Sequence, residues 1–176
     1  ARQGIAVYTS PNEVVEPVAQ LTIAMILALA RNLPLHAKDA WEGRWTKRTG
    51  FLLAEWTIGL VGFGRIGRTV ARYLSSFRPH IVVCDPFLQQ RDIPEGVELR
   101  ELAVLLAESD LVSLHVSRDR DLGVLIGRNE LAMMKRGSYL VNTARGFLVD
   151  EAALLEALTS NRLAGAALDV FGDEPY

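Results

Sequence analysis

Cysteine is almost absent from this chain, because Cys84 is the only one among 176 residues. A single cysteine cannot close an intramolecular disulfide, so the sequence favours a reducing compartment, and we expect a cytoplasmic protein. No cluster of cysteine and histidine has metal-ligand spacing, and no metal is expected. The chain also lacks a large excess of either charge, because 19 basic and 21 acidic side chains give a formal net charge of -2. Without an excess of positive charge, neither nucleic acid nor a membrane surface is an expected partner.

Long hydrophobic runs are also missing. The longest apolar stretch, Leu21–Ala30, is too short to span a bilayer and lacks the flanks of a signal peptide. Hydrophobic residues at 49% and charged residues at 23% are typical of a globular domain with a core. The length suits one domain, and the chain begins at Ala1 without an initiator methionine. We therefore expect a fragment of a longer protein.

A glycine-rich turn is the feature around which the chain is organised. The short apolar run Thr57–Val61 predicts a buried strand. Gly62, Gly64 and Gly67 follow in the pattern Gly-x-Gly-x-x-Gly, and an amphipathic helix begins there. The first glycine of such a turn allows a tight bend, the second lets the backbone approach a pyrophosphate, and the third lets the helix pack closely on the strand. The N–H groups and positive dipole end of the helix then face the phosphates.

An acidic residue follows at the distance that a dinucleotide site requires. Asp85 ends the apolar run 80–85, and a carboxylate that holds the adenosine ribose is expected about 20 residues beyond the turn. The alternative is a glycine-rich turn and a strand-end aspartate that merely begin helices. The succession of strand, turn, helix and acid favours the nucleotide site.

Strands alternate with helices along the chain. We expect helices at 14–31, 34–50, 65–77, 99–107, 129–134 and 151–158, the last with Asp150 as its N-cap. We expect strands at 4–8, 57–61, 80–85, 111–115, 138–141 and 163–168. Continuous apolar strands separated by helices predict an α/β fold, a Rossmann-type doubly wound parallel sheet with helices on both faces. Ligands of such folds bind beyond the carboxyl ends of the strands, which here carry Gly62, Asp85, His115, residues 142–145 and Asp169.

The helix expected at 14–31 is apolar on nearly every side and needs cover on nearly every side. A second domain or a second subunit would supply part of that cover, and the alternative is a place within this domain's own core. The shorter helix at 34–50 carries Trp41 and Trp45 on one face, and we expect both rings to pack.

Three motifs together resemble a known family. They are Gly-Phe-Gly-Arg-Ile-Gly at 62–67, Val-Asn-Thr-Ala-Arg-Gly at 141–146 and Leu-Asp-Val-Phe-Gly-Asp-Glu-Pro at 168–175. In this order and spacing they resemble the nucleotide-binding domain of the D-isomer-specific 2-hydroxyacid dehydrogenases, and the resemblance covers essentially the whole chain. It implies an NAD cofactor and hydride transfer between nicotinamide and C2 of a D-2-hydroxy acid or a 2-keto acid.

The resemblance also implies a domain organisation. Residues 1–176 would form the NAD-binding domain, with 1–12 and 170–176 as connections to a substrate domain that this chain does not contain. The family's catalytic histidine follows the Glu-Pro motif, and the chain stops at Tyr176, so that histidine would lie outside it. The resemblance further places the helix at 14–31 in a two-fold dimer, and we expect a homodimer.

Roles on the adenosine side of the cofactor follow from the resemblance. Arg65 and Ile66 would give backbone N–H groups to the pyrophosphate, and Asp85 would accept both hydroxyls of the adenosine ribose. Val116 and Ser117 would line the adenine–ribose side, although the proline and threonines usual there are replaced.

Roles at the reacting end follow in the same way. Thr143 and Ala144 would lie along the nicotinamide ribose, and Asp169 would hold the carboxamide. Arg145 would bind the substrate carboxylate and polarise the C2 carbonyl, a contact suited to a guanidinium. Glu174 would hydrogen-bond the general acid/base histidine and raise its pKa. His115 would be a neighbour of the cofactor without a catalytic role.

Two functions from different classes remain open on the sequence. One is a dehydrogenase, and the other is an NAD(H)-sensing, non-catalytic binding protein resembling the dehydrogenase-like transcriptional corepressors. Such corepressors can retain the arginine and the glutamate that stand here as Arg145 and Glu174. A histidine before paired glycines further along the gene would support the enzyme.

Overall fold

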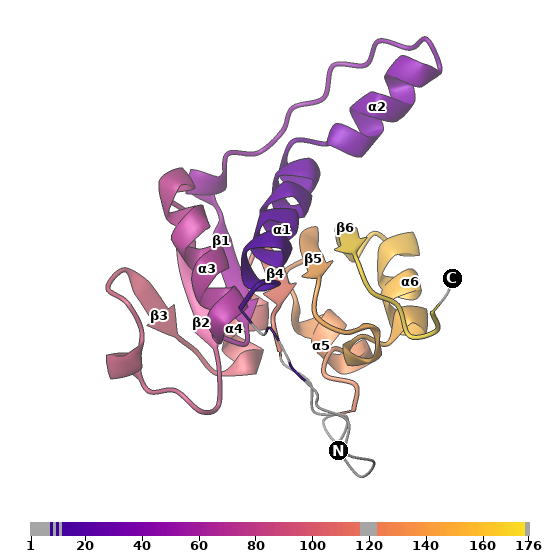
Figure 1. Ribbon diagram of the computed structural model, residues 1–176. Coiled ribbons are helices and arrows are strands. Elements are labelled where there is room, and N and C mark those ends of the chain that lie inside the picture. Colours follow the sequence, from indigo (N-terminus) through magenta and orange to yellow (C-terminus); the bar gives the residue numbers. More distant parts are fainter. Residues whose placement is uncertain (1–7, 9, 11, 117–122, 175–176) are drawn as a thin grey trace.

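Six parallel strands form a single sheet in the order β3-β2-β1-β4-β5-β6 (Figure 1). This computed structural model describes residues 8, 10, 12–116 and 123–174. The strands are β1 (Thr57–Val61), β2 (His80–Cys84), β3 (Val97–Leu99), β4 (Leu111–Leu114), β5 (Ser138–Asn142) and β6 (Leu163–Leu168). This strand order is that of the doubly wound dinucleotide-binding fold, so the predicted fold class is confirmed.

Helices form a layer on each face of the sheet. They are α1 (Val15–Ala30), α3 (Arg65–Leu74), α4 (Leu102–Glu108), α5 (Arg128–Met133) and α6 (Glu151–Thr159), whereas α2 (Leu33–Trp41) projects away from the sheet (Figure 1). On one face Ile26 of α1 and Leu74 of α3 pack with Ile58 of β1 in one buried cluster. On the other face Leu105 of α4 and Leu154 of α6 belong to a second cluster. Two cores separated by one sheet explain why the strands are apolar without interruption.

The predicted helices and strands occur with small shifts, apart from the strand expected at 4–8 and the helix expected at 34–50. Asp150 accepts the N–H of Ala153 at 3.0 Å and caps α6 as predicted. The edge strand β3 was not predicted, and Leu99 belongs to it rather than to a helix. A strand of 3 residues that pairs with one neighbour has too few alternations to show a period. The strand expected at 4–8 falls almost entirely outside the described residues.

The second helix is shorter than predicted, and its tryptophans do not pack. α2 ends at Trp41, Trp45 lies beyond it, and the two residues are 92% and 97% exposed. Figure 1 shows α2 and the segment after it projecting away from the sheet. We refer to residues 31–50 as the arm; its base is closed by the Phe51 N–H, which donates to Ala30 O at 2.8 Å. The expectation that both rings are packed is therefore wrong within this chain.

A buried carboxylate holds the segment after α2 against the helix. Asp39 accepts from Arg44 at 3.0 Å and from Arg48 at 2.7 Å, so the chain after α2 folds back onto the helix. These hydrogen bonds, that from Arg48 above all, lower the pKa of Asp39 from 3.8 to about 2. Gly43, with φ of 65°, makes the turn between the two segments.

The long helix α1 buries one face only. Ala19, Thr22, Ile26 and Ala30 are buried and follow one another at helical spacing, whereas Leu21 on another side is exposed. This domain's own core thus covers part of the apolar surface. Ile23, Met25, Leu27 and Leu29 are only partly buried against it, and Leu21 is left exposed. No single helix in that part of the chain is long and apolar enough to cross a membrane, and the pair α1 and α2, which together pass by length and composition, is bent by 66°.

Candidate functional site

The glycine turn has the geometry that its pattern predicts. Gly62 leaves β1 with φ of +89°, and a Cβ there would lie 2.7 Å from the carbonyl oxygen of His115. A Cβ on Gly67 would lie 2.4 Å from the carbonyl oxygen of Gly62, so only glycine lets α3 approach the strand this closely. Both positions need glycine for the fold itself.

Gly64 differs from its two neighbours, because a Cβ there would meet nothing within 4 Å. Its φ of -75° is open to any residue, so glycine is not needed for the fold at this position. The space beside Gly64 belongs to a cleft that Arg65 and Ile66, in the first turn of α3, also line. First-turn N–H groups lack partners within their helix and attract anions, so this cradle fits a phosphate group.

Asp85 is held in place from two loops. Its Oδ2 accepts the N–H of Phe63 in the glycine turn at 2.9 Å, and its Oδ1 accepts the N–H of Phe87 at 3.0 Å. A carboxylate oxygen has room for two hydrogen bonds, so each oxygen keeps one acceptor position for a ligand hydroxyl. The predicted ribose acid therefore stands next to the predicted phosphate turn.

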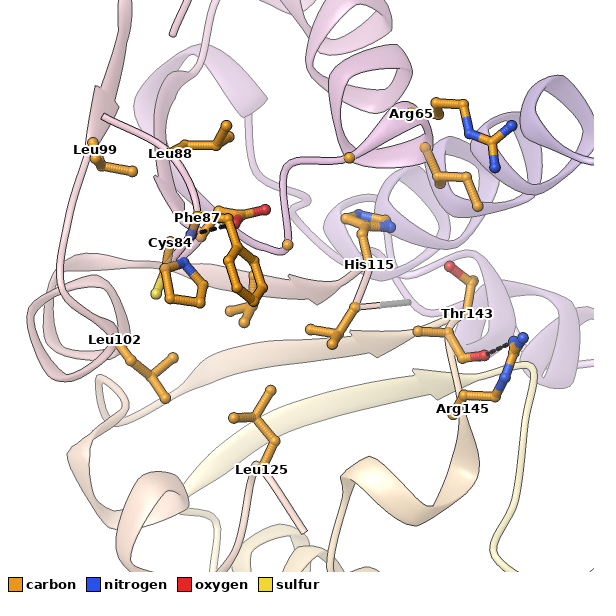
Figure 2. Close-up of a pocket in the computed structure, with 18 of the residues that line it drawn as sticks. Arg65, Cys84, Phe87, Leu88, Leu99, Leu102, His115, Leu125, Thr143 and Arg145 are labelled. Atoms are coloured by element: carbon orange, nitrogen blue, oxygen red, sulfur yellow. Dashed lines mark hydrogen bonds between the residues drawn. The ribbon is translucent and has the colours of Figure 1, made fainter. Parts of the chain in front are cut away.

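One cleft of about 1510 Å³ runs along the carboxyl edge of the sheet. Figure 2 shows that its two ends differ in character. One end is apolar and is lined by Phe87, Leu88, Leu99, Leu102 and Leu125. The other end carries the polar residues Arg65, His115, Thr143 and Arg145. A flat aromatic base would suit the first end, and ribose and charged groups would suit the second.

Asn142 shapes the loop that carries the polar end. Its Oδ1 accepts the N–H of Ala144 at 3.0 Å, and its Nδ2 donates to the carbonyl of Arg145 at 2.8 Å. The side chain of Asn142 is buried, whereas Arg145 is exposed at the rim and donates to the carbonyl of Ala144 at 2.6 Å. No carboxylate pairs with Arg145 among the described residues, so its positive charge is available to an anionic ligand.

The structure brings most of the predicted site residues to this cleft and leaves some outside its lining. Those on the cleft are Gly62, Gly64, Arg65, Ile66, Asp85, Val116, Thr143, Ala144 and Arg145. Gly67 lies behind the turn, and Ser117 lies outside the described residues.

Asp169 and Glu174 lie beyond β6 and do not line the cleft. The N–H of Asp169 donates to Asn142 O at 3.0 Å, and Glu174 Oε1 accepts the N–H of Phe171 at 2.9 Å. A Cβ on Gly146 would lie 1.9 Å from the carbonyl oxygen of Phe171, so this segment packs tightly against the loop that carries Arg145. Asp169 and Glu174 are therefore neighbours of the rim rather than parts of its surface.

Of the histidines that the structure describes, His115 alone lines the cleft. Its Nε2 lies 3.0 Å from Ser113 Oγ, and its Nδ1 is buried without a partner among the described residues. Burial lowers the pKa of His115 from 6.5 to about 4 and keeps the ring neutral at pH 7.

Sequence reasoning missed the contribution of α1 to this site. Val14, Val15 and Val18 line the cleft, and Thr22 hydrogen-bonds Thr143 at 2.9 Å. The available signal was a threonine within the mostly apolar part of this helix. No group of three histidine, cysteine or acidic side chains in the described part of the chain could hold a metal ion.

The fold and the site define a dinucleotide-binding domain of the Rossmann type. The defining features are the strand order of the parallel sheet, the glycine turn before α3 and the position of Asp85 beside that turn. Residues 23–176 match the family described as D-isomer specific 2-hydroxyacid dehydrogenase, NAD binding domain. The chain belongs to this family, and the predicted NAD-binding domain is confirmed.

Similar proteins and structures agree with this assignment. The chain is 37% identical to the D-3-phosphoglycerate dehydrogenase of Archaeoglobus fulgidus, over 99% of this chain and 34% of that protein. It is 39% identical to the hydroxypyruvate reductase of Thermotoga maritima, over 98% of this chain and 56% of that protein. It thus spans between a third and a little over half of these relatives.

Solved structures resemble the fold closely. D-lactate dehydrogenase of Aquifex aeolicus, complexed with NAD and lactic acid, matches with a TM-score of 0.88 and 35% identity, over 98% of this chain and 53% of that one. A D-isomer specific 2-hydroxyacid dehydrogenase of Xanthobacter autotrophicus, in complex with NADPH and MES, matches with a TM-score of 0.84 and 30% identity, over 93% of this chain and 52% of that one. Similar structures therefore contain either cofactor.

Proposed function

We propose that this chain is the cofactor domain of an NAD-dependent D-2-hydroxyacid dehydrogenase. The complete enzyme transfers a hydride between nicotinamide and C2 of a D-2-hydroxy acid or 2-keto acid. The observation that carries the proposal is the meeting of the glycine turn, Asp85 and the loop 143–145 on one cleft. The dehydrogenases and reductases among its relatives support the same reaction class. They give the alternative of a non-catalytic NAD(H) sensor no comparable support.

The cofactor fits the cleft in one direction. The open space at Gly64 and the first turn of α3 receive the pyrophosphate, with Arg65 and Ile66 donating backbone N–H groups. Asp85 accepts the hydroxyls of the adenosine ribose, and the adenine lies at the apolar end beside Val116. Ser117, which follows Val116 in the sequence and lies outside the described residues, is the further residue assigned to the adenine–ribose side.

At the polar end Thr143 and Ala144 lie along the nicotinamide ribose. Asp169, a neighbour of this rim whose N–H donates to Asn142 O, is the partner assigned to the carboxamide. When bound, the nicotinamide ring supplies or takes the hydride. The guanidinium of Arg145 is exposed at the rim and pairs with no carboxylate of the described residues, so it is free to bind the carboxylate of the substrate. Its positive charge then draws electron density from the C2 carbonyl of the substrate. Glu174 orients the acid/base histidine, which a part of the protein outside this chain contributes.

The ends of the chain connect this domain to a substrate domain. Residues 1–12 and 170–176 serve as the two connections, and the greater length of the relatives leaves room for such a domain. The single cysteine, Cys84, fits a cytoplasmic, reducing compartment.

The complete protein is a homodimer in this proposal. The arm carries Trp41 and Trp45 almost fully exposed, and α1 leaves apolar residues such as Leu21 at the surface. Exposed aromatic side chains on a projecting segment are typical of an interface, and a second copy of the chain supplies the matching surface.

A substitution at Gly64 tests the cofactor assignment. Gly64→Ala adds a methyl group to empty space, so we expect the melting temperature to stay unchanged. We expect NADH affinity, measured by fluorescence titration, to fall at least tenfold, because the methyl group occupies the place of the pyrophosphate. Gly165→Ala in β6 is the matched control. Gly165 does not line the cleft, and its added Cβ would make ordinary contacts at 3.4 Å with the side chains of Leu29 and Tyr139. Unchanged NADH affinity in Gly64→Ala would contradict the proposed binding mode.

A further inference from the structure

Thr22 places a hydroxyl on the buried, otherwise apolar face of α1. It is 0% exposed, and its Oγ1 lies 2.9 Å from Oγ1 of Thr143, which is 121 residues away in the sequence. Thr143 lines the polar end of the cleft, between His115 and Arg145 (Figure 2). A buried pair of hydroxyls therefore connects α1 to the rim of the site.

The direction of this hydrogen bond follows from counting protons. Thr22 Oγ1 also donates to the carbonyl oxygen of Val18 at 2.8 Å. A hydroxyl carries one proton, so Thr22 can only accept in its contact with Thr143. The Thr143 proton consequently points into the protein. Toward the cleft, Thr143 Oγ1 is left with acceptor capacity alone.

We propose that Thr22 is a positioning residue of the dinucleotide site. Acting through Thr143, it presents to the cleft an oxygen that accepts and does not donate, and this oxygen selects a ligand hydroxyl. With the cofactor oriented as in the proposed function, on which this inference rests, that hydroxyl belongs to the nicotinamide ribose. The adenosine half of the cofactor binds at the other end and does not depend on Thr22.

The alternative is a purely structural role, in which the Thr22 hydroxyl only bonds its own helix and does not affect the cleft. Threonine in a helix often bonds the carbonyl four residues earlier, with no consequence beyond the helix. Thr159 in α6 does this, since its Oγ1 donates to Leu155 O at 2.9 Å on an exposed face. Thr159→Val therefore removes the same local bond away from the cleft and is the matched control.

Ligands that contain or lack the second ribose separate the two roles. NADH and ADP-ribose contain it, and ADP does not, so all three are titrated calorimetrically against the 176-residue chain and its variants. We expect Thr22→Val to lower the affinities for NADH and ADP-ribose by about fivefold to tenfold, the effect of one lost hydrogen bond. The affinity for ADP is expected to stay unchanged. Thr22→Ser keeps the hydroxyl and is expected to retain the original affinities. Thr159→Val changes none of them.

Two further measurements complete the test. Thr143→Val removes the acceptor without altering α1. We expect it to lower the affinity for NADH and to leave the affinity for ADP unchanged. Adding Thr22→Val to Thr143→Val is expected to cause no further loss, because Thr22 acts through Thr143. An equal loss for ADP and NADH in Thr22→Val, or no loss for either, would overturn the proposal. A wild-type chain that binds ADP but neither NADH nor ADP-ribose would instead overturn the proposed function.

Discussion

The N–H of Phe63 donates to the Asp85 carboxylate at 2.9 Å, across 22 positions of sequence. This bond joins the loop that would hold the phosphates to the acid that would hold the adenosine ribose. The carboxylate is thereby oriented before any ligand arrives. In the proposed binding mode its negative charge stands where a 2′-phosphate would have to lie.

Cofactor choice is the first prediction. We expect the wild-type chain to bind NADH more tightly than NADPH, because a carboxylate accepts a hydroxyl and repels a phosphate. Asp85→Asn is expected to lower NADH affinity by about 10-fold to 100-fold and to narrow the preference, as measured by fluorescence titration with both cofactors. Asp92→Asn is the control, since Asp92 also accepts a backbone N–H, that of Gln89, but lies outside the cleft lining. Equal or tighter binding of NADPH by the wild type would refute the assignment.

Binding without turnover is the second prediction. Of the three histidines, His36 lies in the arm and His80 bonds Glu98 at the amino end of β2. His115 lines the cleft, but its pKa of about 4 keeps the ring neutral at pH 7, and a neutral imidazole is too weak an acid to protonate the substrate. General acid–base help contributes about 10²–10⁴-fold, so we expect NADH binding and no oxidation above background with glyoxylate, hydroxypyruvate or pyruvate. Clear turnover that Arg145→Ala abolishes would show that the acid lies within these 176 residues.

Assembly through the arm is the third prediction. Light scattering of the 19.4 kDa chain is expected to give about twice that mass. We expect the double variant Trp41→Asp and Trp45→Asp to be monomeric, because two charges would face an apolar partner surface. Leu155→Asp, at an exposed leucine on α6, is expected to stay dimeric. A monomer at every concentration, without aggregation, would count against the arm as an interface.

The fourth prediction concerns pH. Because the folded-state pKa of His115 is about 4 against 6.5 for an unperturbed ring, the unfolded chain binds a proton first as pH falls. The stability contributed by the neutral ring is complete above pH 6.5 and is lost progressively down to pH 4. We expect urea unfolding to show a loss of roughly 2 kcal/mol between pH 6.5 and pH 5. His115→Gln, which does not titrate, should remove this loss, and an identical slope in both proteins would show that another group causes it.

The fifth prediction concerns the arm itself. Asp39→Asn weakens the bonds to Arg44 and Arg48 that fold the segment back onto α2, so we expect faster tryptic cleavage after these arginines. NADH affinity is expected to stay unchanged, because the arm does not line the cleft. Glu42→Gln is the control, since its ion pair with Arg44 is exposed. Similar cleavage rates in both variants would show that Asp39 does not stabilise the arm.

Features that depend on local pattern follow from the sequence alone. A buried parallel strand is apolar throughout, and a phosphate turn needs glycine at particular positions, as the φ of Gly62 and the close approach at Gly67 illustrate. Asp85 was predictable for the same reason, because the length of one helix and one strand sets its distance from the turn.

Which distant side chains meet depends on the tertiary structure. Nothing local indicates that Thr22 bonds Thr143, or that Asn142 braces the loop after it from both sides. The packing predicted for Trp41 and Trp45 is wrong because helical spacing shows which side chains share a face but not whether anything covers it. Contacts of this kind depend on how whole elements pack, and a periodic pattern within one element carries no information about its neighbours.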